Sequence, residues 1–138
     1  MKSPVELAFE RHVEFVAKKD RAAFLANFHE DAVVQDPVGA TPLDPSGEGH
    51  RGHAAIAAFW DAAIEPGQVR FEIDRAYVCG DEIANVGTVC NQLPGEPELR
   101  ADGVFVYRVH PDGRLISLKA YWDYDAVMGD VTFPEAER

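Results

Sequence analysis

Hydrophobic residues follow a helical period in the first part of the chain. They recur every three or four positions from Val5 to Val16, directly after a Ser3-Pro4 pair. A serine cap followed by proline at the first helical position is typical of a helix start. His12 falls inside this apolar stripe, so its side chain is expected to point toward the core.

Two more helices are expected in the first half. Asp20 can cap a second helix that carries Phe24 and Phe28. A third is predicted over residues 54–64, where apolar residues again recur at helical spacing. The segment before it, residues 39–53, is rich in glycine and proline and has no periodicity, which predicts a loop that forms a lid or a rim at the mouth of a pocket.

The pattern changes in the second half. Four strands are predicted over residues 69–79, 83–93, 99–110 and 115–123, with Gly-, Pro- and Asp-containing turns between them. Short turns connect antiparallel neighbours, so these strands should form a meander. The order of elements predicts an α+β fold, in which N-terminal helices pack on a curved, mostly antiparallel sheet and enclose a pocket.

Length and charge narrow the class of protein. A chain of 138 residues is long enough for a single domain over residues 1–138, and residues 129–138 are expected to form a loose tail or to lie on a partner subunit. The net charge of −11 opposes binding to nucleic acid. The longest apolar run, residues 54–60, is far too short to span a bilayer. A cytoplasmic protein without a membrane partner is expected.

The cysteines do not predict a disulfide. Cys79 and Cys90 lie in successive predicted strands, but the turn between these strands would place Cys79 opposite a residue near Ile83. Free cysteines fit a reducing compartment.

The histidines do not predict a metal site. Four histidines, His29, His50, His53 and His110, could be considered as ligands, but His50 and His53 lie in the flexible glycine-rich loop without a nearby cysteine or well-spaced carboxylate. No metal site is therefore expected.

One carboxylate has a fixed place in this pattern. Val33 and Val34 favour a strand, and Pro37 forces the residue before it, Asp36, into an extended conformation. Asp36 is a candidate general base if an apolar pocket surrounds it, and an ordinary turn residue if none does.

The predicted strands and helices supply walls for such a pocket. Alternation places small and aromatic residues of the third and fourth strands of the meander on one face, and aromatic residues of the helices can complete the enclosure. A space with more aromatic lining than hydrogen-bonding groups suits a small, flat, hydrophobic ligand. The expected ligand-binding residues are Phe28, Val38, Phe59, Trp60, Ala101, Gly103, Phe105, Tyr107, Leu118, Ala120 and Trp122.

Three segments together carry a family resemblance. They are DAVVQDPVG at 31–39, RGHAAIAAFW at 51–60 and GVFVYRVHPDGRLISLKAYW at 103–122. Over roughly residues 5–125, the chain resembles the ketosteroid isomerase branch of the NTF2-like (SnoaL-like) superfamily, including its actinobacterial steroid-isomerase-like members. The resemblance implies a cone-shaped α+β barrel, usually a homodimer, with a deep pocket and no cofactor.

The resemblance also implies an activity. In this family the aspartate of the Asp-Pro-Val-Gly step, here Asp36, moves a proton between two carbons of a 3-oxo-Δ5 steroid to give the conjugated Δ4 ketone. A tyrosine and a protonated acid normally stabilise the resulting oxyanion. Their positions fall here on His12 and Phe105, and those of helper tyrosines fall on Phe28 and Trp60. His12 is therefore the expected second catalytic residue.

Other functions are open at this point. Phe105 cannot donate a hydrogen bond, which favours the alternative of a non-catalytic or weakly catalytic binder of steroids or similar fused-ring ligands. Asp102 could replace the missing acid only if a bulge at Gly103 inverted the alternation of the strand. Epoxide hydrolysis would use Arg100 and Asp102, but Ala120 lies where a second carboxylate is needed. A polyketide cyclase activity built on the one pocket aspartate is a further alternative.

Overall fold

Helices come first and hairpins follow, as predicted. The computed structural model describes residues 1–129, so the predicted tail at 129–138 lies almost wholly outside the described residues. The elements are α1 (Pro4–Ala17), α2 (Arg21–Ala26), β1 (Phe28–Gln35), β2 (His50–Arg51), α3 (Gly52–Phe59), the π-helical turn η1 (Trp60–Ile64), β3 (Gln68–Cys79), β4 (Glu82–Gln92), β5 (Leu99–Val109), β6 (Leu115–Tyr121) and α4 (Tyr124–Met128).

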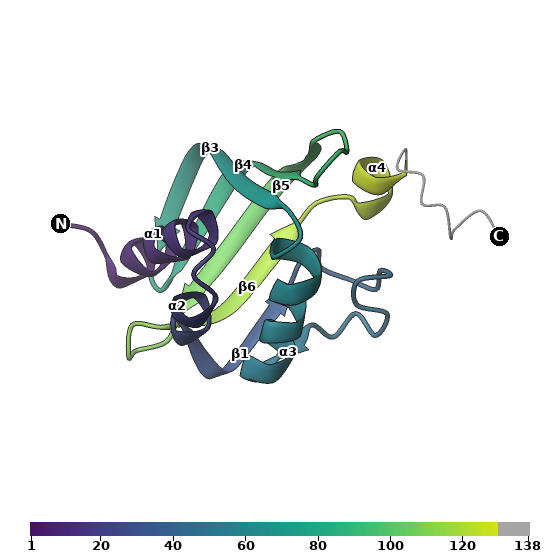
Figure 1. The fold of residues 1–138 in the computed structure, drawn as a ribbon. Helices are drawn as coiled ribbons and strands as arrows, with labels where there is room; N and C mark the ends of the chain where they lie inside the picture. The colour runs from purple at the N-terminus through teal and green to yellow at the C-terminus, as the bar shows by residue number, and fades with distance from the viewer. Residues whose placement is uncertain (130–138) are drawn as a thin grey trace.

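The six strands form one curved sheet that does not close. Their order is β2-β1-β6-β5-β4-β3, and β3 to β6 are the predicted antiparallel meander. β1 returns to pair in parallel with β6, which a meander alone does not predict. Helices α1, α2 and α3 lie on the concave side of this sheet (Figure 1). The α+β fold predicted from the sequence is confirmed.

Local chemistry explains the start of α1. The Ser3 side chain accepts a hydrogen bond from the Glu6 amide, and the Glu6 carboxylate accepts one from the Ser3 amide. This capping box satisfies two amides that a helix start otherwise leaves without partners. The helix then presents His12 and its apolar stripe to the sheet, as expected.

Glycines permit the curvature of the sheet. Gly87 and Gly103 lie directly opposite each other in β4 and β5. A Cβ atom on Gly103 would lie 2.0 Å from the Tyr121 carbonyl oxygen, and one on Gly87 would lie 2.2 Å from the Glu72 carbonyl oxygen. No side chain fits at either position, so adjacent strands approach closely here and the sheet bends.

The second helix is shorter than predicted. It ends at Ala26, and Phe28 begins β1 instead of lying on the helix. Asn27 explains the change. Its side-chain amide donates to the Ala8 carbonyl oxygen at 3.0 Å, and its main-chain carbonyl oxygen accepts from the Leu115 amide at 2.8 Å. These contacts connect α1 and β6, which are distant in sequence.

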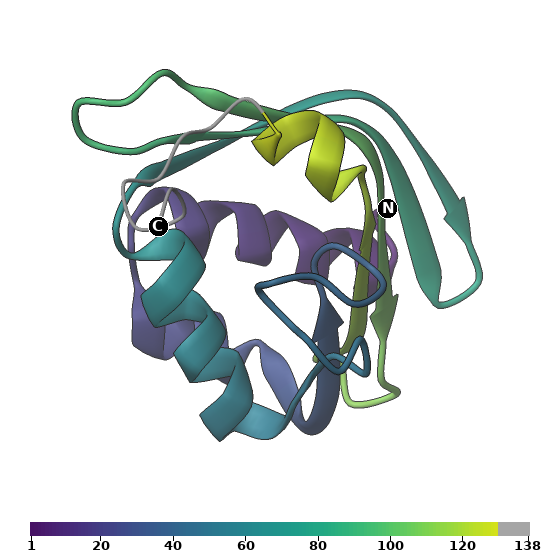
Figure 2. The same cartoon turned by 90° about the vertical axis from the view of Figure 1, so that its right-hand side faces the viewer.

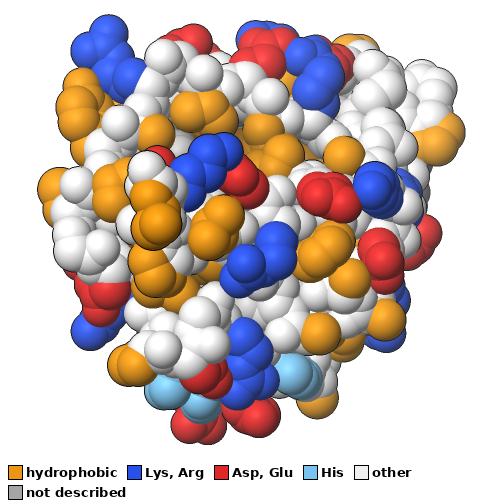
Figure 3. All heavy atoms as spheres, turned by 90° about the vertical axis from the view of Figure 1, so that its left-hand side faces the viewer, with side chains coloured by type: hydrophobic (Ala, Val, Ile, Leu, Met, Phe, Trp, Pro, Cys, Tyr) orange, Lys and Arg blue, Asp and Glu red, His pale blue; other side chains and the backbone are white. Residues whose placement is uncertain are grey.

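The exterior is polar, with ion pairs across the strands. Arg70 of β3 and Arg100 of β5 each pair with Glu72 of β3 and with Glu98, which directly precedes β5. One view of the surface shows basic, acidic and hydrophobic side chains interspersed (Figure 3). Cys90 is buried and Cys79 exposed, and both are free, as expected. None of the described helices is long and apolar enough to cross a membrane.

Candidate functional site

A cavity of about 210 Å³ lies between the helices and the concave face of the sheet. Leu43 from the predicted rim loop and Val127 and Met128 from α4 are part of its wall, and the loop and α4 lie on the same side of the molecule (Figure 2). Eight of the residues expected at the site line it, namely His12, Asp36, Phe59, Ala101, Phe105, Tyr107, Leu118 and Trp122.

The other five expected residues do not line the cavity. Phe28, Trp60 and Ala120 are fully buried in the core behind its wall. Val38 is exposed at the surface, because the chain turns outward after Pro37. The fifth residue, Gly103, serves the close approach of β5 to the Tyr121 backbone.

Asp36 is placed by the pairing of β1 with β6. Gln35 lies opposite Lys119 in the parallel ladder, and the Val38 amide donates to the Ala120 carbonyl oxygen at 2.9 Å. Asp36 lies between these two attachments, directly after the last residue of the strand. Its side chain is therefore held at the cavity wall by main-chain bonds on both sides.

Within the described part of the chain, the Asp36 carboxylate has one hydrogen-bond partner. The Trp122 indole Nε1 donates to Asp36 Oδ1 at 2.6 Å, a charge-assisted bond. Burial nevertheless raises the pKa of Asp36 above its usual value, and this cause outweighs the Trp122 hydrogen bond and the nearby His50, which both lower it. Because its pKa is raised, this buried carboxylate is a stronger base than a carboxylate in water, even with one oxygen hydrogen-bonded.

His12 is a neutral imidazole in the same cavity. It is 4% exposed, and burial lowers its pKa to about 3. Its Nδ1 atom has no hydrogen-bond partner among the described residues. Because an unpaired buried N–H group costs more than an unpaired lone pair, this favours the tautomer with the proton on Nε2.

Tyr107 places a hydroxyl group beside these two residues. It is 2% exposed, and its ring centroid lies 5.0 Å from that of His12. Burial, and then the charge of Asp36, raise the pKa of Tyr107 well above its usual value. The phenol therefore stays protonated.

The acid expected at position 105 has no substitute on the neighbouring residue. Asp102 accepts a hydrogen bond from the Thr88 hydroxyl on the outer face of the sheet. The pairing of β4 with β5 runs through Gly103 without a shift of register, so the alternation is not inverted. Arg100 is also on the outer face, paired with Glu72, and the set for epoxide hydrolysis is not assembled at the cavity.

Comparisons with known proteins establish the family and the fold. The family model of the SnoaL-like domain matches residues 9–118. The chain belongs to the SnoaL-like family. It is also 28% identical over 122 residues to the steroid Delta-isomerase of Nocardioides simplex, a match that covers 88% of this chain and 92% of the relative.

Solved structures extend the likeness of this SnoaL-like protein. The Delta 5-3-ketosteroid isomerase from Mycobacterium sp. is 35% identical with a TM-score of 0.86, and the match covers 91% of this chain and 97% of that one. A Mycobacterium tuberculosis protein in complex with estradiol-17beta-hemisuccinate is 29% identical with a TM-score of 0.85, covering 90% and 97%. The fold is thus NTF2-like, and its structural neighbours include steroid-binding proteins.

Sequence reasoning missed several features of this SnoaL-like site. Trp122 was expected only as a wall, and its bond to Asp36 joins residues 86 positions apart. The sequence offers His50 only as a possible metal ligand, yet His50 pairs with Val34 in the β1–β2 ladder and lies near Asp36. The signal for Trp122 was its position directly after the last strand; nothing local indicated the role of His50.

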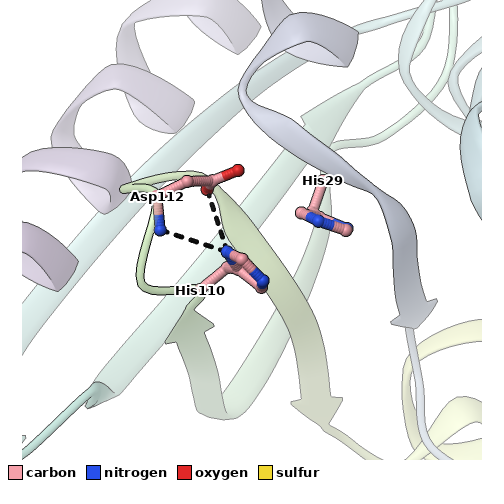
Figure 4. A group of neighbouring side chains, drawn as sticks. All are labelled: His29, His110 and Asp112. Atoms are coloured by element: carbon pink, nitrogen blue, oxygen red, sulfur yellow. Dashed lines mark hydrogen bonds and ion pairs between the residues drawn. The ribbon is translucent and has the colours of Figure 1, made fainter.

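A second polar cluster lies on the surface, formed by His29, His110 and Asp112 (Figure 4). The two imidazole rings stack with their centroids 4.2 Å apart. Nδ1 of each ring accepts a backbone amide proton, and the Asp112 carboxylate is paired with Arg114. The polar atoms that could hold a cation are thus largely committed to other partners.

Proposed function

We propose that this protein isomerises a 3-oxo-Δ5 steroid to the conjugated Δ4 ketone, with Asp36 carrying the proton. The observation that carries the proposal is the Asp36 carboxylate at the wall of a largely apolar cavity, with Oδ1 bound by Trp122 and a pKa raised by burial. The steroid Delta-isomerase and ketosteroid isomerase relatives supply the reaction and the class of ligand.

The chemical steps need only groups of this chain. Asp36 removes a proton from the carbon between the carbonyl group and the double bond, and the electron pair moves onto the carbonyl oxygen to give a dienolate. The same carboxylic acid then returns the proton to the far carbon of the former double bond. His12 Nε2 donates a hydrogen bond to the oxyanion, since the imidazole is neutral and lines the cavity.

The direct test is conversion of 5-androstene-3,17-dione, followed by the ultraviolet absorbance of the conjugated enone. Asp36→Asn should reduce kcat at least about 100-fold, the usual worth of a general base. Asp102→Asn is the matched control: it also removes a carboxylate, but from the outer face of the sheet, so turnover should persist.

The outcomes separate the candidate functions. Absence of turnover above the uncatalysed rate at high enzyme concentration would overturn the isomerase proposal. Saturable steroid binding without turnover would instead support the binder. The homodimer implied by the family resemblance stays a prediction, which sedimentation velocity can test.

A further inference from the structure

Tyr107 is a polar exception in an aromatic wall. Its ring centroid lies 4.8 Å from that of Phe9, and Phe71 and Phe24 also line or adjoin this part of the cavity around His12. Packing alone would be met by phenylalanine here as well. The hydroxyl group therefore needs a separate explanation.

The Tyr107 hydroxyl has no hydrogen-bond partner in the part of the chain that the structure describes. Among residues 1–129, no group forms a hydrogen bond with it, and the only influences on its ionisation are burial and the charge of Asp36. The Tyr107 oxygen is also not among the fully enclosed side-chain atoms that lack a partner, so it is accessible from the cavity. Because Tyr107 lines the cavity, a ligand can provide the missing acceptor.

The position of Tyr107 suits the oxygen of a ligand whose carbon atoms react at Asp36. Tyr107 and Asp36 line the same cavity, the Asp36 charge contributes to the raised Tyr107 pKa, and the two side chains are not hydrogen-bonded to each other. A ligand can thus lie between base and donor, as proton abstraction next to a carbonyl group requires. His12, 5.0 Å away between ring centroids, is on the same side.

Phe105 leaves the ligand oxygen without the hydrogen-bond donor expected at that position. It lies on the same face of β5, two residues before Tyr107, where it faces Ala120 across the ladder, while Tyr107 faces Leu118. Phe105 cannot stabilise an oxyanion. Because two residues span about 7 Å along a strand, the backbone of Tyr107 lies about 7 Å from that of Phe105. Tyr107 therefore offers its hydroxyl from a different point of the same strand face.

We propose that Tyr107 is a second hydrogen-bond donor to the ligand oxygen, acting with His12 in place of the acid absent at position 105. The inference rests on the proposed function and assigns its oxyanion-stabilising group. Tyr107 keeps its proton throughout. It donates a hydrogen bond that shortens as negative charge develops on the oxygen, while Asp36 alone transfers the proton.

The first test is kinetic. Tyr107→Phe should lower kcat for 5-androstene-3,17-dione about 100- to 1000-fold, the usual effect of losing one oxyanion donor, with a much smaller change in KM. Tyr121→Phe is the matched control, because Tyr121 is 45% exposed on the outer face of β6. It should leave both constants unchanged.

The second test does not require turnover. Calorimetry would compare binding of 4-androstene-3,17-dione with binding of its 3-deoxy analogue, which lacks the ring-A oxygen. Wild-type protein should prefer the ketone, and Tyr107→Phe should reduce this preference about 2- to 12-fold, as expected for one neutral hydrogen bond. The variant should also be at least as stable as wild type, since it loses no internal hydrogen bond.

The results distinguish the two proposals. Normal kcat and an unchanged ketone preference in Tyr107→Phe, with turnover abolished in Asp36→Asn, would overturn the role of Tyr107 and leave the isomerase intact. If wild-type protein shows no turnover but Tyr107→Phe still reduces the ketone preference, the isomerase proposal is overturned and the hydrogen bond from Tyr107 to the ligand is supported. A destabilised Tyr107→Phe variant with full ketone preference would show that the hydroxyl is structural, and would overturn the proposal.

Discussion

Replacing Trp122 by phenylalanine removes one N–H group from Asp36 while keeping an aromatic ring in the cavity wall. The Trp122 Nε1–H donates to Asp36 Oδ1 at 2.6 Å and stabilises the carboxylate relative to the carboxylic acid. Burial already raises the pKa of Asp36. Loss of this bond should raise that pKa further.

The size of the effect follows from the type of bond. A hydrogen bond to a charged group is worth about 1.5–3 kcal/mol, which corresponds to about 10- to 150-fold in the equilibrium between carboxylate and acid. Water that enters beside the smaller phenylalanine ring would recover part of this energy. The effect of Trp122→Phe is therefore expected toward the lower end of that range.

The measurement is a pH titration of the Asp36 carboxyl carbon by NMR, with the signal assigned by its absence in Asp36→Asn. Trp60→Phe is the control, because the Trp60 indole donates to Glu65 at 2.8 Å and not to Asp36. Trp122→Phe should move the midpoint upward, and Trp60→Phe should not. An unchanged or lower midpoint in Trp122→Phe would refute the role assigned to the indole.

Two predictions concern stability. Because the pKa of Asp36 is raised in the folded state, its contribution to stability is present at low pH and is lost as pH rises through the folded pKa. Asp36→Asn should therefore raise the free energy of unfolding more at about pH 7 than at about pH 3, measured by urea denaturation; an equal gain at both would contradict the assignment. Ile56→Ala removes most of a fully buried side chain of α3 and should lower the free energy of unfolding by about 2–5 kcal/mol. A change below about 1 kcal/mol would contradict this, because it would mean that neighbouring side chains refill the space that Ile56 leaves.

Sequence alone determined the elements whose causes are local. The Ser3 cap, the apolar stripe with His12 and the four strands of the meander all follow from short-range patterns, and the structure has them at nearly the predicted boundaries. The place of Asp36 at the end of β1 is also local, because Val34 and Pro37 define the strand and its end.

Tertiary structure decided what surrounds Asp36. The parallel pairing of β1 with β6 brings Trp122 to the carboxylate, and the bend at Gly103 turns a predicted wall residue into a point of close strand contact. Tertiary structure also left the Tyr107 hydroxyl at the cavity without a hydrogen-bond partner among residues 1–129. Alternation along a strand tells which face a side chain takes, but not which distant strand lies opposite or which polar atoms find partners there. The electrostatic character of Asp36 therefore emerged only from the folded chain.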